Sequence, residues 1–224
     1  MIENSELNWP RDTAGYDIEE APNARSEIKM LRRGMYMDGD ICIVPRGGRI
    51  DDYDPLKIDG LYRQLAESDL TPEGALQFVS TFGIPIRSAI EDRRYPLHDF
   101  LEAVFLMRLV LSHASAEVWG EFARVVTGAV DSRFRGGRIE AHIALRARND
   151  GERPDVVLHP NDLWSAIWLQ LATDITAGAN LRSCAQCGIW FKYGPGTGRR
   201  STAVYCSPKC QSADAYAKRK AAAK

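Results

Sequence analysis

Four of the chain's five cysteines lie in two close pairs near its C-terminal end, Cys184 with Cys187 and Cys206 with Cys210. Each short spacing lets two thiolates converge on one ion, and a set of four thiolates is typical of a tetrahedral, structural Zn²⁺ site. Four such ligands fill the coordination sphere and leave no position for a catalytic water. The sequence therefore predicts one structural zinc ion held by these four side chains.

The residues beside the cysteines predict how this site is built. Gly188 follows the first pair and permits the tight backbone turn of a metal knuckle. Ser207 and Pro208 are typical of the N-cap and the first position of a helix. Cys210 then lies in the first helical turn, where free N–H groups and the helix dipole favour a thiolate.

The stretch between the two cysteine pairs predicts a β-hairpin. Its strands are expected at Ile189–Phe191 and Ala203–Tyr205, and its tip at the glycine-rich stretch Gly194–Ser201. That stretch lacks the Gly-Lys-Ser/Thr ending of a phosphate-binding loop. A knuckle, a hairpin and a helix that share four cysteines predict a small module of treble-clef-like form.

Two other uses of paired cysteines fit the sequence less well. Disulfides require an oxidising compartment, and Met1–Asn4 lacks the basic and apolar pattern of a signal peptide. A redox Cys-x-x-Cys motif stands alone near a βαβ pattern, whereas here a second pair follows. We therefore expect a cytoplasmic protein with reduced, metal-bound cysteines.

The other residues that can do chemistry form no catalytic pattern. No Gly-x-Ser-x-Gly nucleophile elbow occurs, and no histidine lies in the cysteine-rich segment to serve a nuclease as general base. The acidic cluster Asp51, Asp52 and Asp54 falls in a turn-rich stretch and is interpreted as solvated. The histidines are scattered without ligand-like spacing: His98, His113, His142 and His159. The sequence therefore predicts that the protein is not an enzyme.

Composition and charge set the broad class and the partner. The 224 residues, 45% hydrophobic and 26% charged, are typical of a soluble globular protein, and no apolar run is long enough to span a bilayer. The net charge of −1 hides a strong asymmetry. From Arg182 onward nine Lys and Arg residues face one acid, a net +8, whereas the preceding part carries 20 cations and 29 acids, a net −9. Only the C-terminal part is expected to approach a polyanion.

Hydrophobic periodicity predicts an α+β fold in three parts: a loosely ordered arm at 1–24, a mainly helical body with short β-hairpins at 25–180, and the zinc-binding module with its basic tail at 181–224. Trp9 and Tyr16 can attach the arm to the body. The predicted strands of the body cover 41–44, 139–146 and 156–158. Its predicted helices cover 61–66, 72–82, 96–111 and 115–132, and a last one that Asn161 or Asp162 caps and Gly178 closes.

Three conspicuous side chains of the body are interpreted as core rather than as binding groups. Cys42 falls inside an apolar strand pattern, where a free cysteine acts as a small hydrophobe. Trp164 and Trp168 share one helical stripe with isoleucine and leucine. That helix runs into the first knuckle almost without a linker, so the module is expected to lie close to the body.

The segment from Leu181 to about Lys220 resembles the zinc-finger tail of the bacterial CGNR family. The elements that carry the resemblance are Cys184, Cys187, Gly188, Phe191, Gly198-Arg199-Arg200, Tyr205-Cys206-Ser207, Cys210, Tyr216 and Lys218-Arg219. After Cys210 the chain has Gln211-Ser212-Ala213 in place of the Gly-Asn-Arg that names the family. Because members of that family are regarded as DNA-binding transcriptional regulators of stress responses, the resemblance implies the same role here. It covers about a fifth of the chain.

The basic residues of the module are the candidate nucleic-acid contacts: Arg199, Arg200, Lys209, Lys218, Arg219 and Lys220. A zinc-stabilised cationic surface that contacts several phosphates predicts a DNA-binding regulator. The alternative is a zinc-stabilised module for protein–protein interaction that binds no nucleic acid. A protein partner or a second copy of the chain is then expected on the helical body, and no membrane is expected as a partner.

Overall fold

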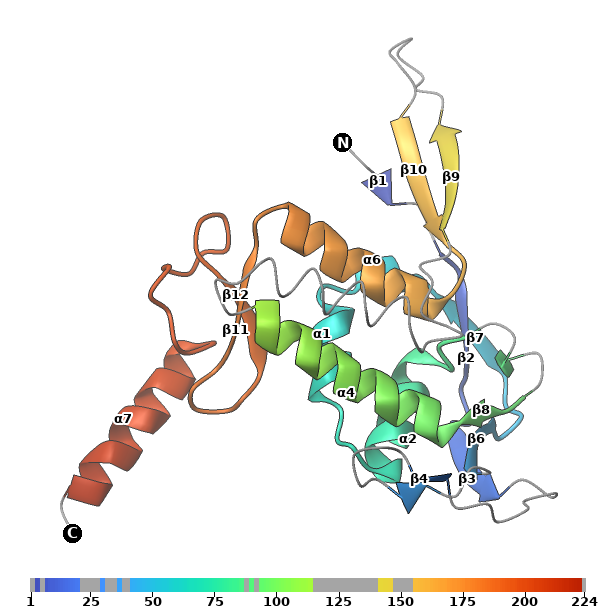
Figure 1. The fold of residues 1–224 in the computed structure, drawn as a ribbon, viewed down its shortest axis with the longest axis horizontal. Helices are drawn as coiled ribbons and strands as arrows, with labels where there is room; N and C mark the ends of the chain where they lie inside the picture. The colour runs from blue at the N-terminus through green and yellow to red at the C-terminus, as the bar shows by residue number, and fades with distance from the viewer. Residues whose placement is uncertain are drawn as a thin grey trace.

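The structure is a computed structural model that describes residues 3–4, 7–20, 29–30, 36–37, 41–86, 89–90, 93–114, 141–146 and 155–222. The helix predicted at 115–132 lies outside these residues. The described part is a mixed α+β fold in which helices form the body and short strands surround it (Figure 1).

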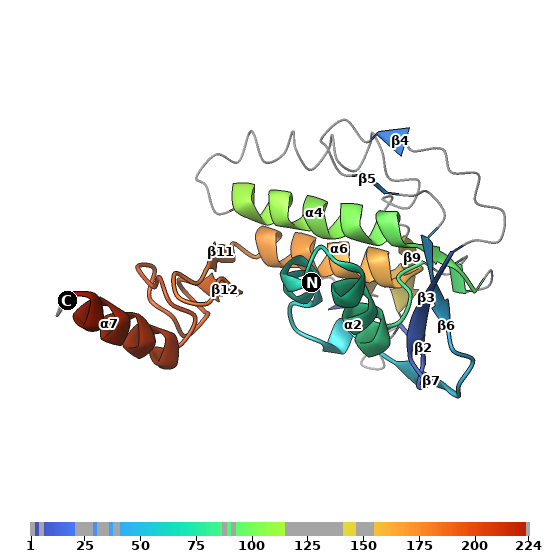
Figure 2. The same ribbon diagram turned by 90° about the horizontal axis from the view of Figure 1, so that it is seen from below.

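The body is built on two apolar helices, α4 (Leu97–Ala114) and α6 (Leu163–Thr176), which lie side by side in both views (Figures 1 and 2). Phe100, Val104 and Met107 recur at helical spacing on α4, and all three are fully buried. Trp164 and Trp168 are buried on α6, as predicted for core residues. The core cluster therefore lies between these helices and the elements that cover them.

Two shorter helices close this core, α1 (Leu61–Glu67) and α2 (Pro72–Phe82). Both contact α4, and α1 also contacts α6. The predicted bounds of α2 are confirmed, because Thr71 caps it through the N–H of Gly74 at 3.1 Å and Gly83 ends it.

Helix boundaries elsewhere also follow local signals. Asp162 caps α6 by accepting the N–H of Ser165 at 2.7 Å. Helix α4 begins at Leu97, one residue later than predicted, because Pro96 belongs to the strand before it.

The strands form several small sheets. In one, β6 (Ile41–Pro45) pairs with β3 (Tyr16–Glu20) and with β8 (Tyr95–Pro96), all antiparallel; in another, β2 (Trp9–Asp12) pairs with β7 (Ile50–Tyr53). Strand β10 (Asp155–Pro160) pairs with β9 (Ala141–Arg146) and, in parallel, with β1 (Glu3–Asn4). Strands β4 (Lys29–Met30) and β5 (Tyr36–Met37) form a further short pair. The predicted strands at 41–44, 139–146 and 156–158 are confirmed within the described residues, and Cys42 on β6 is half-buried rather than fully buried.

The prediction of a loosely ordered arm is wrong for residues 9–12 and 16–20, which form β2 and β3. Trp9 is fully buried and its Nε1 donates to the carbonyl of Ile84 at 3.1 Å. Tyr16 is buried as well, so both aromatic residues attach this segment to the body as expected. Four- and five-residue strands at a sheet edge are too short and too polar to give a clear period-two pattern.

Three carboxylates, of which Asp12 is buried, hold this N-terminal segment in place. Asp12 is 2% exposed and accepts backbone N–H groups from Ala14, Gly47 and Gly48. Asp54 accepts the N–H of Leu7 at 3.3 Å, so it is bound rather than solvated. In the same acidic cluster, Asp51 pairs with Arg11 at 2.7 Å.

Candidate metal centre

The first cysteine pair lies on a loop that follows a hairpin strand. Strands β11 (Asn180–Ser183) and β12 (Trp190–Tyr193) pair antiparallel, and the loop between them carries Cys184 and Cys187. The N–H of Cys184 donates to the carbonyl of Ile189 at 2.9 Å, and the N–H of Gly188 donates to the carbonyl of Cys184 at 2.9 Å. Gly188 has a φ of 75°, as the predicted knuckle requires.

The second pair lies at the start of α7 (Pro208–Ala222). The hydroxyl of Ser207 accepts the N–H of Cys210 at 3.3 Å, and Pro208 is the first helical residue, both as predicted. Cys206 precedes the helix, and its N–H donates to the sulfur of Cys184 at 3.3 Å. The two pairs are therefore joined by a backbone-to-sulfur bond.

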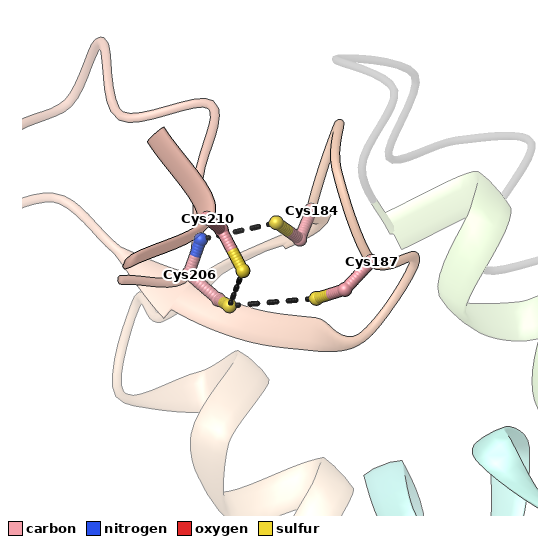
Figure 3. Close-up of side chains that lie close together, drawn as sticks. All are labelled: Cys184, Cys187, Cys206 and Cys210. Atoms are coloured by element: carbon pink, nitrogen blue, oxygen red, sulfur yellow. Dashed lines mark hydrogen bonds between the residues drawn. The ribbon is translucent and has the colours of Figure 1, made fainter. Parts of the chain in front are cut away.

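The four sulfur atoms converge on one point (Figure 3). All lie within 4.8 Å of one another. The Sγ of Cys206 is 3.6 Å from that of Cys187 and 3.5 Å from that of Cys210. Cys184 is buried and Cys187 is exposed, so one side of the cluster faces solvent. The cluster could hold a metal ion, and it is formed by the four residues that the spacing predicted.

The surroundings of the four sulfur atoms disfavour deprotonation of all four thiols unless a cation is bound. Burial raises the pKa of the Cys184 thiol, but backbone N–H groups of Cys206, Cys187 and Gln186 outweigh this and lower the pKa to about 6. For Cys206, burial and then the neighbouring sulfurs, that of Cys210 first, raise the pKa of the thiol well above its usual value. One thiolate forms easily here, and a bound divalent cation would compensate the charge of the others.

The predicted hairpin needs one correction, because Ala203–Tyr205 is not a strand. The partner of β12 is β11, which precedes the knuckle. Leu181 on β11 and Phe191 on β12 are both buried, which favours this pairing. Residues 203–205 instead run beside the knuckle, where Val204 accepts the N–H of Ala185 at 3.0 Å.

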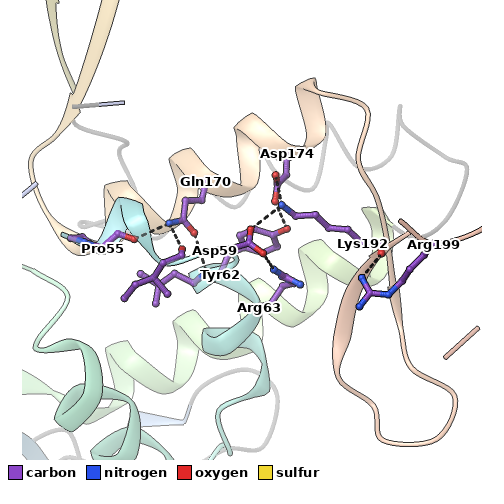
Figure 4. Close-up of polar contacts among 10 residues, drawn as sticks. Pro55, Asp59, Tyr62, Arg63, Gln170, Asp174, Lys192 and Arg199 are labelled. Carbon is purple, nitrogen blue, oxygen red and sulfur yellow. Dashed lines mark hydrogen bonds and ion pairs between the residues drawn. The ribbon is translucent and has the colours of Figure 1, made fainter. Parts of the chain in front are cut away.

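Strand β12 attaches the cysteine-rich segment to the body (Figure 4). The ammonium of Lys192 lies 2.8 Å from Asp174 on α6 and 3.0 Å from Asp59, which precedes α1. Asp174 also accepts the hydroxyl of Tyr62 at 2.6 Å. The N–H of Trp190 donates to Glu67 at 3.0 Å. The hairpin is therefore part of the body's surface, while the second cysteine pair and α7 lie beyond it.

Helix α7 extends away from the body, at the end of the molecule opposite the β2–β7 pair (Figures 1 and 2). Of its residues 208–221, only Cys210 and Asp214 are half-buried, and the rest are exposed. Asp214 accepts the hydroxyl of Tyr205 at 2.6 Å and so connects the helix to the preceding loop.

The structure separates the predicted nucleic-acid contacts into two groups. Arg199 is used inside the cysteine-rich segment, where its guanidinium donates to the carbonyls of Cys206 at 3.0 Å and Lys192 at 3.2 Å and lies 5.4 Å from the centre of the Phe191 ring. Lys218 forms an ion pair with Asp214 at 2.7 Å. The other four predicted contacts are Arg200, Lys209, Arg219 and Lys220, and all six predicted contacts are exposed.

Sequence reasoning missed the internal roles of two other cations. Lys192 bridges two carboxylates of the body, as described above. Arg182 donates to the carbonyl of Ala203 at 3.0 Å and lies over the ring of Tyr193 at 4.4 Å. Arg182 follows buried Leu181 on β11, and Lys192 follows buried Phe191 on β12. This alternation in the sequence could have indicated that both cations lie on ordered strands.

Comparison with family models, curated proteins and solved structures gives no match for this chain. The resemblance to the CGNR tail therefore stays a prediction. Within the described residues, no helix combines the length and apolar character that a membrane crossing requires.

Proposed function

We propose that the protein is a DNA-binding transcription regulator whose C-terminal module is held together by one structural Zn²⁺ ion. The observation that carries this proposal is the convergence of four cysteine sulfurs at the base of an exposed, cationic helix. A tetrahedral site with Zn–S bonds of about 2.3 Å has sulfur–sulfur distances of about 3.8 Å. The spacings of 3.5 Å and 3.6 Å at Cys206 are compatible with that size.

The ligand chemistry also favours zinc. Four soft thiolates in a compact, tetrahedral arrangement suit Zn²⁺ or an iron–sulfur centre, and a single ion between two knuckle-like turns suits Zn²⁺ better. A hairpin, a knuckle and a helix whose first turn supplies the last ligand would make a treble-clef-like unit. When bound, the ion would supply the charge that four thiolates need, and it would fix α7 relative to β12.

The charge distribution supports DNA as the partner. The preceding part of the chain carries a net −9, whereas the segment from Arg182 onward carries +8. Arg182 and Lys192 are half-buried and make internal contacts, so the exposed cations of this segment lie on α7 and beside it at Arg199 and Arg200. A polyanion would be attracted to that end and repelled by the other.

The test is a binding titration of the full chain with fragmented genomic DNA at two salt concentrations, alongside measurement of bound metal. We expect one zinc per chain and an affinity that falls steeply with salt, because cations that bind phosphates displace counterions. Cys210→Ser should lose both the metal and the binding. Metal-loaded protein that does not bind DNA at low salt would contradict the proposal for DNA and leave the zinc site intact.

One observation favours the alternative of a protein-interaction module. Ile189 and Val204 are 45% and 41% exposed, and their backbones bond to neighbouring residues of the first knuckle. Two exposed apolar side chains near the metal centre could contact a protein partner. Binding of that kind would tolerate salt and would survive neutralisation of the α7 cations, so the same titration separates the two functions.

A further inference from the structure

We propose that α7 enters the major groove of double-stranded DNA with one face, formed by Lys209, Ala213, Tyr216 and Lys220. This inference rests on the proposed DNA binding and specifies which surface, which form of nucleic acid and which side chains it uses. The four residues recur at i, i+4, i+7 and i+11, so they follow one line along the helix. We call this line the outer stripe.

The outer stripe lies on a side of α7 that the described residues of the chain leave open. All four of its residues are exposed, and Tyr216 is 64% exposed. At 100° per residue, Asp214 and Lys218 lie about 140° and 180° around the helix from Lys209. Those two residues form the ion pair that also contacts Tyr205, so they mark the side that faces the module. Helix α7 extends away from the helices of the body in both views, so a duplex has room to approach it (Figures 1 and 2).

The dimensions of α7 suit the groove of B-form DNA. A helix about 10–12 Å across fits a major groove about 12 Å wide. Lys209 and Lys220 are eleven residues apart, or about 16 Å along the axis, so each can reach the phosphates at one edge of the groove. Between them, the small side chain of Ala213 allows close approach. Tyr216 is then the large group of the stripe that faces the base edges.

The same geometry argues against other nucleic acids. A-form RNA has a deep, narrow major groove that a helix cannot enter. Single strands are bound by several aromatic side chains that stack on successive bases, and Tyr216 is the only aromatic residue of α7. The structure therefore points to duplex DNA in preference to duplex RNA or a single strand.

The first test compares three labelled probes of one sequence, a DNA duplex, an RNA duplex and single-stranded DNA, by fluorescence anisotropy with the zinc-loaded full chain. We expect the DNA duplex to bind about tenfold more tightly than either of the others. Equal binding of the RNA duplex, or tighter binding of the single strand, would overturn groove insertion while leaving nucleic-acid binding intact. Binding of none of the probes would overturn the proposed function as well.

The second test uses two lysines that are matched in charge and lie two residues apart. We expect Lys220→Ala to weaken duplex binding about fivefold or more and to reduce the salt slope by about 1, because it removes one phosphate contact. Lys218→Ala removes the same charge from the opposite side of α7 and should change affinity less than about twofold. Equal losses would show that only net charge matters and would overturn the assignment of the outer stripe.

A third substitution tests the centre of the stripe. Tyr216→Ala should weaken duplex binding about fivefold without changing the salt slope, because the side chain carries no charge. An unchanged affinity would remove Tyr216 from the contact surface. Bound zinc and far-UV circular dichroism, measured on each variant, confirm that the helix is retained.

Discussion

At the scale of single residues, Lys192 joins the cysteine-rich segment to two parts of the body. Its ammonium contacts Asp174 on α6 and Asp59 before α1, which lie 18 and 133 residues away in sequence. The side chains of Lys192 and Asp174 are 23% and 19% exposed, so the pair is more shielded from water than a surface ion pair. An ion pair in this position is worth more than an exposed one, because removing one partner leaves the other charge poorly solvated.

We expect Lys192→Met to lower the free energy of unfolding by about 1–3 kcal/mol, because it leaves Asp174 without its cation. Urea denaturation of the zinc-loaded protein, followed by tryptophan fluorescence, measures this change. Lys209→Met is the matched control on the exposed surface of α7 and should change stability by less than about 0.5 kcal/mol. Similar effects of the two substitutions would show that the bridge contributes nothing.

The same bridge predicts a pH dependence. Partial burial raises the pKa of Asp59, but the nearby charges of Lys192 and Arg63 outweigh this and lower the pKa below its ordinary value of 3.8. A carboxyl group whose pKa is lowered by folding contributes stability that is full above its unfolded pKa and is lost as the pH falls through its folded pKa. The difference in stability between the native chain and Lys192→Met should therefore be constant near neutral pH and shrink below about pH 4. A difference that grows in acid would contradict this assignment.

At the scale of elements, local signals predicted helix ends better than strand partners. The bounds of α2 follow from Thr71, Pro72 and Gly83, whose conformational preferences act within one turn of the chain. The partner of β12 could not be predicted in this way. Ala203–Tyr205 has a stronger β propensity than Asn180–Ser183, and the choice between them depends on burial of Leu181 beside the body.

Two glycines allow a test of how closely α2 packs against β2. Gly83 ends α2 with a φ of 82° and a ψ of 172°, a combination that is nearly restricted to glycine, and a Cβ there would lie 2.5 Å from the carbonyl oxygen of Pro10 on β2. Gly178 follows α6 with a φ of 76°, and a Cβ there meets nothing within 4 Å.

We therefore expect Gly178→Ala to cost about 1 kcal/mol and Gly83→Ala about 2–4 kcal/mol, because only the second substitution adds a collision with β2. Thermal or urea unfolding of both variants measures the difference. Equal costs would mean that α2 and β2 can separate without loss, which would contradict the packing of the N-terminal strands described above.

At the scale of the whole molecule, the sequence predicted which four cysteines lie together and how charge is separated, because both depend on residue type and spacing alone. It did not predict which cations form hydrogen bonds inside the cysteine-rich segment. Arg199 resembled a surface contact in the sequence, yet its guanidinium is held by the carbonyl of Cys206, which only the folded chain brings near. Cys206 is only seven residues from Arg199, but the stretch between them is irregular, so no periodic pattern in the sequence indicates the contact.

The β11–β12 hairpin and α7 also differ in what stabilises them. Leu181 belongs to the core cluster of the body, and Phe191 is 2% exposed, whereas α7 is connected mainly through Cys210 and Asp214. We expect removal of the metal with a chelator to abolish the protection of the α7 amides from hydrogen exchange, because α7 depends on the sulfur cluster. The amides of α4 and α6 should keep their protection. Hydrogen exchange with mass spectrometry measures both at once.

The control for metal removal is Cys42→Ser, which changes the fifth cysteine on β6 and should leave the metal content at one ion per chain. If chelation removed the amide protection of α4 together with that of α7, the body core would not be independent of the sulfur cluster.

Because α7 is held near its start, through Cys210 and Asp214, and is exposed beyond them, its far end amplifies any movement at the knuckle. Lys220 lies ten residues beyond Cys210, or about 15 Å along the axis. A tilt of about 10° at the cysteines would displace Lys220 by about 2.6 Å, on this rise of 1.5 Å per residue. Replacing the proposed Zn²⁺ with an ion of different radius, such as Cd²⁺, would therefore change the direction of the helix tip while leaving the helix's own hydrogen bonds unchanged.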